Sequence, residues 1–359
     1  MIATSGDIEK LLNITRASLE DLHVSVVANV KNRTQDYNDY IEHSITTEFL
    51  SIEEFEDLLS SAQEFGIYTT AYFDVRDFII ETLKKPSGGL NVLFETTQKG
   101  IGKGKDALLP AFCDLINHIY TGPNAFVNAV TGNKYSWTKF LEAHHVPVPR
   151  SWRYSWPRGW TLGEEPPSDI KLICKPIYEC ASIGIDSSSV SNLSIEYKRS
   201  LSYKSQIYKQ PLIVQEFIPG YEVEVPIIST AEGNIILPPV GLSSGENEKI
   251  LGNHVFSFDE IFDDGYSFYS YSEISEHICN EIKQCAENIA NLLELNGYSR
   301  IDFRVGMTGK IYVIDINAYP HIVKHSSFSE SFKLLGHNSH HVVPALVGNA
   351  LQNYKQNQR

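Results

Sequence analysis

Residues 300–317 read RIDFRVGMTGKIYVIDIN, in which two segments of alternating apolar and polar residues flank a short turn. Alternation with a period of two is typical of half-buried strands, and the Thr308-Gly309 pair between them indicates a β-hairpin. A turn centred on this pair leaves Asp302 and Asp315 six residues away on either side, so the two carboxylates are predicted to face each other. Opposed carboxylates repel each other unless a cation lies between them.

The same hairpin gathers a further oxygen atom and a guanidinium group. Strand alternation places Arg300 on the face of Asp302, and Asn317 on the face of Asp315. Carboxylate and amide oxygens are the ligands that Mg²⁺ prefers, and water and nucleotide phosphates commonly complete its coordination. Arg300 beside them would neutralise a phosphate. The alternative interpretation is a solvated hairpin face with incidental charges.

The first third of the chain alternates segments with the periods of strands and of helices. Strand-like segments cover residues 24–30, 66–74 and 90–97, and helix-like segments cover residues 52–65, 75–85 and 106–119. This order predicts an α/β unit with a parallel sheet. The glycine-rich residues 98–106 lack the G-K-[ST] ending of a phosphate loop and are predicted to form a flexible loop.

The remaining two thirds change character. Strand-like runs at residues 171–177, 212–218, 223–229 and 235–240 predict antiparallel sheet. Amphipathic helices are predicted at residues 137–144 and 273–295, the second with apolar residues recurring along one face.

Composition limits the possible functions. The chain has 359 residues and a formal net charge of −14, which predicts no basic surface for a nucleic acid. We find no basic segment followed by an apolar run at the start and no stretch of about 18 apolar residues, so the sequence predicts a soluble, cytoplasmic protein without a membrane segment. The five cysteines form no C-x-x-C pair and are predicted to be reduced thiols.

Residues 298–320, YSRIDFRVGMTGKIYVIDINAYP, resemble the metal-binding strand pair of the ATP-grasp superfamily, and within it that of the D-alanine:D-alanine ligases. The resemblance implies that Asp302, Asp315 and Asn317 bind two Mg²⁺ ions, with Mn²⁺ as a substitute. It also implies a catalytic role for Arg300. The family usually has Glu where this chain has Asp315, so this ligand is one methylene shorter.

Three further segments are similar to nucleotide-binding parts of the same family. Residues 172–185, LICKPIYECASIGI, match the strand and small-residue loop over the phosphates, with Lys175 as a phosphate contact and Ser182 as a catalytic hydroxyl. Residues 212–225, LIVQEFIPGYEVEV, match the segment that holds adenine and ribose. Its expected nucleotide contacts are Gln215, Glu216, Phe217, Ile218 and Glu222. Lys134 matches an ATP-contacting lysine before a helix.

The substrate regions depart from the family pattern. The glycine-rich strand and turn that contact the first substrate are absent around residues 24–33, and His321 follows Pro320 where the family usually has Gly. The resemblance implies substrate contacts for His321, Lys324 and Ser326. Lys249 lies in a segment that resembles the loop closing over substrate and is considered as a further phosphate contact, without a secure counterpart in the family.

We therefore expect an α/β protein with the ATP-grasp fold. Its expected domains are an N-terminal parallel α/β domain (1–122), a central lid domain (123–212) and a C-terminal antiparallel-sheet domain with the metal and substrate sites (213–359). The resemblance implies an ADP-forming ligase that joins a carboxylate to an amine through an acyl phosphate, with amino acids or dipeptides as substrates. Related ligases are often homodimers. The alternative hypothesis is a non-catalytic ATP-binding protein.

Overall fold

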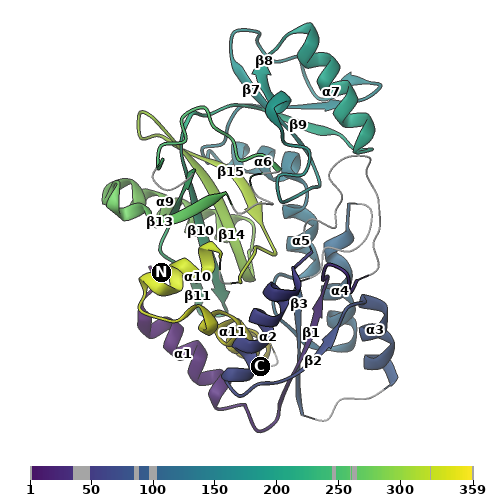
Figure 1. Cartoon of the computed structure of the whole chain (residues 1–359), viewed down its shortest axis with the longest axis vertical. Helices are drawn as coiled ribbons and strands as arrows, with labels where there is room; N and C mark the ends of the chain where they lie inside the picture. Colours follow the sequence, from purple (N-terminus) through teal and green to yellow (C-terminus); the bar gives the residue numbers. More distant parts are fainter. Residues whose placement is uncertain are drawn as a thin grey trace.

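The computed structural model describes residues 2–34, 49–84, 89–96, 103–244, 248–258, 260, 265–323 and 325–357. Its strands form three sheets, arranged one after another along the long axis of the molecule (Figure 1). The mixed α/β fold class predicted from the sequence is confirmed. The domain boundaries at residues 122 and 212 stay predictions.

The first sheet is parallel, as predicted, with strand order β2-β1-β3-β4. Its strands are β1 (Leu22–Ala28), β2 (Tyr68–Tyr72), β3 (Leu90–Thr96) and β4 (Ile119–Tyr120), and its helices are α1 (Ser5–Arg16), α2 (Ile52–Glu64), α3 (Val75–Lys84) and α4 (Leu108–Ile116). Helix α2 begins with a capping box, in which Ser51 and Glu54 each accept a hydrogen bond from the other's backbone amide. This cap fixes the first turn of α2 beside the functional site. The predicted flexible loop falls largely on residues 97–102, outside the described residues.

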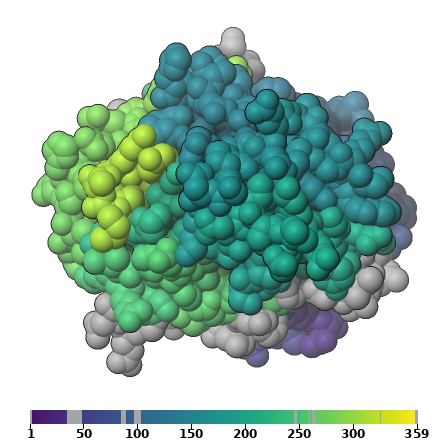
Figure 2. All heavy atoms as spheres, turned by 90° about the horizontal axis from the view of Figure 1, so that it is seen from above, coloured from purple at the N-terminus to yellow at the C-terminus, as the bar shows by residue number. Residues whose placement is uncertain are grey.

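The second sheet is antiparallel, with strand order β6-β5-β9-β7-β8. Its strands are β5 (Ser151–Ser155), β6 (Gly159–Trp160), β7 (Lys171–Pro176), β8 (Val190–Asn192) and β9 (Leu212–Glu216), accompanied by α5 (Ala125–Thr131), α6 (Lys134–Ala143) and α7 (Ile195–Ile207). Leu172 and Val214 from the sheet and Leu201 from α7 form a small core. Seen from above, this blue-green segment covers much of the molecule's upper face (Figure 2).

The third sheet has strand order β13-β12-β10-β14-β15, with β11 paired to β10. Its strands are β10 (Gly220–Thr230), β11 (Gly233–Ile236), β12 (Val240–Ser244), β13 (Tyr266–Ser270), β14 (Gly297–Gly306) and β15 (Ile311–Asn317), with helices α9 (Glu276–Leu292), α10 (Ser327–Leu334) and α11 (Val342–Asn357). Ile282 and Ile289 of α9 pack into the core of this sheet. Helix α9 begins later than predicted because Ser275 caps it after a short 3-10 turn. None of the helices in the described ranges is both long and apolar enough to cross a bilayer.

The predicted hairpin forms between β14 and β15, with one difference in register. The Gly306 amide donates to the Lys310 carbonyl (2.9 Å), so the turn is centred half a residue earlier than expected. An irregularity between Asp302 and Phe303 places one extra residue in β15 and compensates for this offset. Asp302 therefore faces Asp315, as the sequence predicted.

The first and third sheets meet through a close approach of two backbones. Gly297, at the start of β14, has a φ of +70°, and a Cβ atom added there would lie 2.1 Å from the Gly122 carbonyl oxygen. No side chain fits at that distance, so the contact requires glycine. Tyr319 reinforces it nearby, because its hydroxyl donates to the Glu95 carboxylate of β3 (2.9 Å).

We predict that Gly297→Ala lowers the free energy of unfolding by about 3 kcal/mol. The strain of alanine in a left-handed backbone conformation adds to the clash of its Cβ atom with the Gly122 carbonyl. Gly159→Ala is the matched control: Gly159 has a φ of +72° but no atom within 4 Å of the point that an added Cβ would occupy, and about 1 kcal/mol is expected. Urea unfolding followed by circular dichroism measures both. Equal losses in the two variants would show that the close approach is not rigid.

Candidate active site

A cavity of about 500 Å³ lies where the three sheets meet. Thirteen of the fifteen side chains that the sequence predicted for the site line it: Lys134, Lys175, Ser182, Gln215, Glu216, Phe217, Ile218, Glu222, Arg300, Asp302, Asp315, Asn317 and His321. Ser326 lines a neighbouring hollow instead. Lys324 lies outside the described residues. The structure thus brings together residues separated by up to 187 positions in the chain.

Three carboxylates form one row across the floor of this cavity. In the register of the third sheet, Glu224 of β10 lies opposite Asp302 of β14, and Asp302 lies opposite Asp315 of β15. We call Glu224, Asp302 and Asp315 the carboxylate row. Neighbouring strands are about 5 Å apart, so three carboxyl groups are held close together in a buried place. Such an arrangement requires cations beside it.

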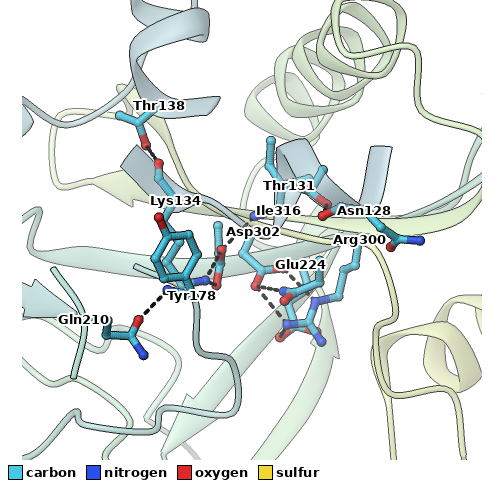
Figure 3. A network of polar contacts seen from close by, with 12 residues as sticks. Asn128, Thr131, Lys134, Thr138, Tyr178, Gln210, Glu224, Arg300, Asp302 and Ile316 are labelled. Carbon is cyan, nitrogen blue, oxygen red and sulfur yellow. Dashed lines mark hydrogen bonds and ion pairs between the residues drawn. The ribbon is translucent and has the colours of Figure 1, made fainter. Parts of the chain in front are cut away.

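Those cations come from two directions. The Lys134 ammonium, from the first turn of α6, lies 2.7 Å from both oxygens of Asp315. The Arg300 guanidinium binds both oxygens of Asp302 (2.7 and 2.8 Å) and lies 3.2 Å from Glu224 (Figure 3). Asn317 donates its amide to Asp302 (3.1 Å). The row is thereby cross-linked to helix α6 and within its own sheet.

Burial and these cations move the pKa values in opposite directions. Burial raises the pKa of Glu224 to about 8, more than the Arg300 charge lowers it. Burial also acts to raise the pKa of Asp315, but Lys134 and Lys175 outweigh it and hold that pKa below its ordinary value. Burial and the Lys134 charge lower the pKa of Lys175. Lys134 therefore binds Asp315 and the half-buried Lys175 acts on the same carboxylate through its charge, an arrangement suited to receiving an additional anion.

The expected adenine and ribose segment forms the wall above this floor. Glu222 pairs with Arg304 across the β10–β14 ladder (2.9 Å), and the Arg304 guanidinium also lies 5.7 Å from the centre of the Phe217 ring. Glu216 binds Arg150 at the surface. Gln215 is 2% exposed, and its side-chain NH₂ group has no hydrogen-bond partner among the described residues. A buried donor facing a cavity is a ready contact for a ligand acceptor.

The loop after β7 closes the cavity on its second-sheet side. Ala181 and Ser182 adopt left-handed backbone conformations (φ +47° and +54°), and the Ser182 hydroxyl donates to the Phe256 carbonyl (3.1 Å). Glu179 binds Lys105 of the first α/β unit (3.3 Å), with both side chains 5% exposed. Gln210 also donates to Glu179 (2.7 Å). This buried ion pair fastens the loop to the first α/β unit.

The expected substrate residues lie at the far end. His321 binds Glu54 of α2 (3.1 Å), so the bulky side chain after Pro320 contacts the first α/β unit. Ser326 caps α10 by accepting from the Ser329 amide. Lys249 pairs with Glu273 and lies over the Tyr269 ring, and it lines neither cavity. The phosphate contact considered for Lys249 therefore has no support in this arrangement.

Sequence reasoning missed three site residues. Glu224 alternates with Glu222 in the segment YEVEV, and this period of two was a readable sign that both face the cavity. Glu54 and Glu179 carried no comparable sign, because their partners His321 and Lys105 are far away in the sequence.

Comparisons with known proteins agree with this geometry. The sequence profile described as "D-ala D-ala ligase C-terminus" matches residues 166–348, about half of the chain. The chain is 25% identical over 250 residues to the D-alanine–D-alanine ligase of Marinomonas sp. (strain MWYL1), which covers 69% of this chain and 74% of the relative. It is 24% identical over 289 residues to that of Wolbachia pipientis wMel, covering 79% and 85%.

Solved structures show the same fold. The D-alanine–D-alanine ligase of Bacillus anthracis complexed with ATP superposes with a TM-score of 0.70 at 13% identity, covering 94% of this chain and 99% of that one. The ligase from Coxiella burnetii gives a TM-score of 0.64 at 17% identity, covering 94% and 97%.

Fold and site together define an ATP-grasp enzyme, an ADP-forming ligase that uses ATP to join a carboxylate to an amine. The chain belongs to the D-alanine–D-alanine ligase C-terminal family. The resemblance recognised in the sequence is confirmed, and the non-catalytic alternative is not favoured.

We predict that Lys105→Met loosens the loop after β7, because it leaves the Glu179 carboxylate buried without its cation. Amide hydrogen exchange of residues 178–186 should become more than about tenfold faster. The control is Lys198→Met, which removes an exposed pair with Glu165 and should leave exchange unchanged within about twofold. Unchanged exchange in Lys105→Met would mean that the loop is held by other contacts.

We predict that the Glu54–His321 pair contributes stability only above acid pH. Burial acts to raise the pKa of Glu54, but the hydrogen bond and charge of His321 lower it from the ordinary 4.5 to about 2. The contribution is therefore complete above pH 4.5 and is lost as the pH falls through 2. Glu54 is 35% exposed, so after screening Glu54→Gln should cost about 1 kcal/mol at pH 7. Urea unfolding should show this difference shrinking between pH 5 and pH 3; a constant difference would exclude the linkage.

Proposed function

We propose that this ligase activates the carboxylate of one amino acid or dipeptide with ATP and joins it to the amine of a second. The observation that carries the proposal is the carboxylate row with its two lysines and Arg300 on the floor of a cavity bounded by all three sheets. A site that binds a nucleotide without reaction needs no such convergence of buried charges. Transfer of a phosphoryl group does, because its transition state spreads charge over several oxygens.

The nucleotide would lie between the second and third sheets. Lys134, Lys175 and Arg300 would contact its phosphates, since Lys134 is buried, the other two are half-buried, and all three cations face the same cavity. Gln215, Glu216, Phe217 and Ile218 would hold adenine, with the unpartnered Gln215 amide as one polar contact. Glu222 would accept hydrogen bonds from the ribose hydroxyls. Ser182 would join them after releasing the Phe256 carbonyl.

Asp302, Asp315 and Asn317 would hold Mg²⁺. Their side chains offer only oxygen ligands once Asn317 turns its carbonyl inward, and Lys134 and Arg300 already occupy the carboxylate oxygens as cations. Within the described ranges, no three His, Cys, Asp or Glu side chains gather into a metal-binding group. Nucleotide phosphates and water would therefore supply the other ligands. A bound Mg²⁺ ion would screen the negative charge of the phosphates. Two Mg²⁺ ions, or Mn²⁺ in their place, would use the same ligands.

The reaction requires no protein nucleophile. A carboxylate oxygen of the first substrate attacks the γ-phosphorus, ADP leaves, and an acyl phosphate forms. The neutral amine of the second substrate then attacks the acyl carbon, the C–O bond to phosphate breaks, and the nitrogen loses a proton. The phosphoryl oxygens, whose negative charge shifts during the transfer, are bound by Lys134, Lys175 and Arg300. The loop fastened by Glu179 excludes water from the acyl phosphate.

Small amino acids are the proposed substrate class, because relatives named D-alanine–D-alanine ligases act on them. His321 narrows the cavity beside Glu54 and would shape the pocket of the second substrate together with Lys324 and Ser326. A homodimer, a cytoplasmic location and the absence of nucleic-acid partners stay predictions.

The test is incubation with Mg-ATP and pooled amino acids and dipeptides, following ADP, phosphate and product masses. We expect substrate-dependent ADP release with a condensed mass. Asp315→Asn should lower the turnover at least about 100-fold, because Lys134 loses its partner and the row loses a ligand. Glu281→Gln, which changes an exposed carboxylate on α9, should retain the wild-type rate. ATP binding without turnover on any pair would refute the proposal.

A further inference from the structure

Helix α7 carries a charged residue on its buried face. Tyr197, Leu201 and Lys204 of the helix, and Tyr208 directly after it, recur at a spacing of three and four residues, and each is at most 3% exposed. Such a stripe normally packs a helix against a core through apolar side chains. An ammonium group is costly to desolvate, so a lysine in this stripe requires polar partners of its own.

Those partners lie on the loop after β7. The Lys204 ammonium donates to the Gly184 carbonyl (3.0 Å) and to the Asp186 carboxylate (2.5 Å). The Ser189 hydroxyl donates to the same Gly184 carbonyl (3.2 Å). Gly184 has a φ of +79°, and a Cβ atom added there would lie 2.9 Å from the Tyr208 ring. Polar and steric contacts therefore hold this part of the loop against the end of α7.

Gln210 holds the opposite end of the loop. Its side-chain carbonyl accepts from the Tyr178 amide (2.8 Å), and its side-chain NH₂ group donates to Glu179 (2.7 Å). The Ser205 hydroxyl donates to the Gln210 backbone carbonyl (2.8 Å) and so ties Gln210 back to α7. Both ends of the loop are thus fixed by residues 204–210, the last turn of α7 and the residues that follow it.

The loop held in this way is one wall of the cavity proposed for the nucleotide. It lines the cavity with Ser182, Ile183 and Ile185. The Ser182 hydroxyl donates to the Phe256 carbonyl (3.1 Å), and the Phe258 amide donates to the Ile185 carbonyl (3.1 Å), so the wall extends to a further segment. Lys204 is not among the described residues that line the cavity. The position of the wall therefore depends on a lysine that lies behind it.

We propose that Lys204 is a positioning residue for the nucleotide. Through Gly184 and Asp186 it holds the loop after β7 in the conformation that receives Mg-ATP. This inference rests on the proposed function, which places ATP between the second and third sheets. The loop contacts the nucleotide before and during phosphoryl transfer, whereas the cations on the floor of the cavity bind the group that is transferred. Loss of the Lys204 contacts therefore raises KM for Mg-ATP more than it lowers kcat.

Lys204→Met tests this, because it keeps a long unbranched side chain and removes the ammonium group. We expect the Kd of Mg-ADP, measured by isothermal titration calorimetry, and KM for Mg-ATP to rise at least about tenfold. Both kcat and KM for the amino-acid substrates should change less than about threefold. A merely structural role predicts a different pattern, since a partly unfolded preparation has fewer active sites and loses kcat at unchanged KM.

Two further variants complete the test. Lys198→Met removes an exposed lysine of the same helix, paired with Glu165 (2.6 Å), and should keep the wild-type Kd and KM. Asp186→Asn removes the charge that Lys204 binds but keeps an oxygen for the Ser188 amide (2.7 Å). It should raise the Kd of Mg-ADP about threefold, and it should add nothing when combined with Lys204→Met, because the two residues share one contact.

The outcomes separate the inference from the proposed function. A wild-type Kd for Mg-ADP in Lys204→Met, or a loss of kcat at constant KM, would overturn the inference. Asp186, whose side chain is 39% exposed, decides through Asp186→Asn if Lys204→Met does not fold. If nucleotide binding weakens as expected but no substrate pair releases ADP, the proposed function fails and the positioning role stands. If the wild type turns over and the variants keep its nucleotide affinity, the ligase stands and the inference fails.

Discussion

Three carboxylates in one row of a buried sheet are the constraint around which the molecule is arranged. The register of β10, β14 and β15 places Glu224, Asp302 and Asp315 side by side, and their repulsion is only weakly screened in a buried site. Leaving such charges without partners would cost several kcal/mol each, which is comparable to the net stability of a domain. The cations are therefore as necessary to the fold as they are to the chemistry. Lys134 comes from α6 and Arg300 from the sheet itself, so folding of the third sheet depends on docking of the segment before it.

One continuous apolar core, with Val24 of β1, Tyr298 of β14 and Phe328 of α10 among its members, joins the first α/β unit to the third sheet, and polar links at the cavity add to it. Lys105 with Glu179 and His321 with Glu54 both bridge the first α/β unit to elements from elsewhere in the chain. Ion pairs of this kind regain solvation when they separate, so opening costs less than exposing apolar surface. By contrast, the Gly122–Gly297 backbone contact has no freedom to slide. The combination gives a cavity whose first-unit and third-sheet sides are joined by an apolar core and a close backbone contact, and whose loop after β7 is held by a separable ion pair.

Local patterns were sufficient for much of this architecture. The hairpin at residues 300–317, the parallel unit and the antiparallel runs followed from the alternation of apolar residues, because that alternation reports directly which face is buried. Asp302 opposite Asp315 was predicted on a turn that is in fact centred half a residue earlier, and the extra residue in β15 restored the pairing. No local pattern in the sequence specifies such a bulge. The agreement at the two aspartates thus depended on an irregularity that the prediction did not contain.

The sequence did not show which residues that are far apart in the chain lie next to each other in the fold. Glu224 becomes part of the row only when β10 lies next to β14, and strands 78 residues apart carry no local sign of their pairing. Glu54 belongs to a helix of the parallel unit, yet its partner follows the last strand of the third sheet. These non-local residues are the ones that distinguish the substrate end of the cavity. The proposed phosphate contacts Lys175 and Arg300 and the proposed metal ligands of the hairpin lie in segments whose spacing is local enough to be recognised in the sequence.

This division has a physical origin. The phosphoryl group is the same in every reaction of the class, so its ligands can be fixed on adjacent strands of one sheet, where register sets their positions within fractions of an ångström. The acceptor varies, and the hollow beside the cavity where we propose that it binds is lined from the start of α2, the residues after β15 and α10. Substitutions at these edges leave the sheet intact. His321 illustrates the consequence: a side chain in place of the family's usual glycine meets Glu54 and changes the charge and width of the pocket without disturbing the row beneath it.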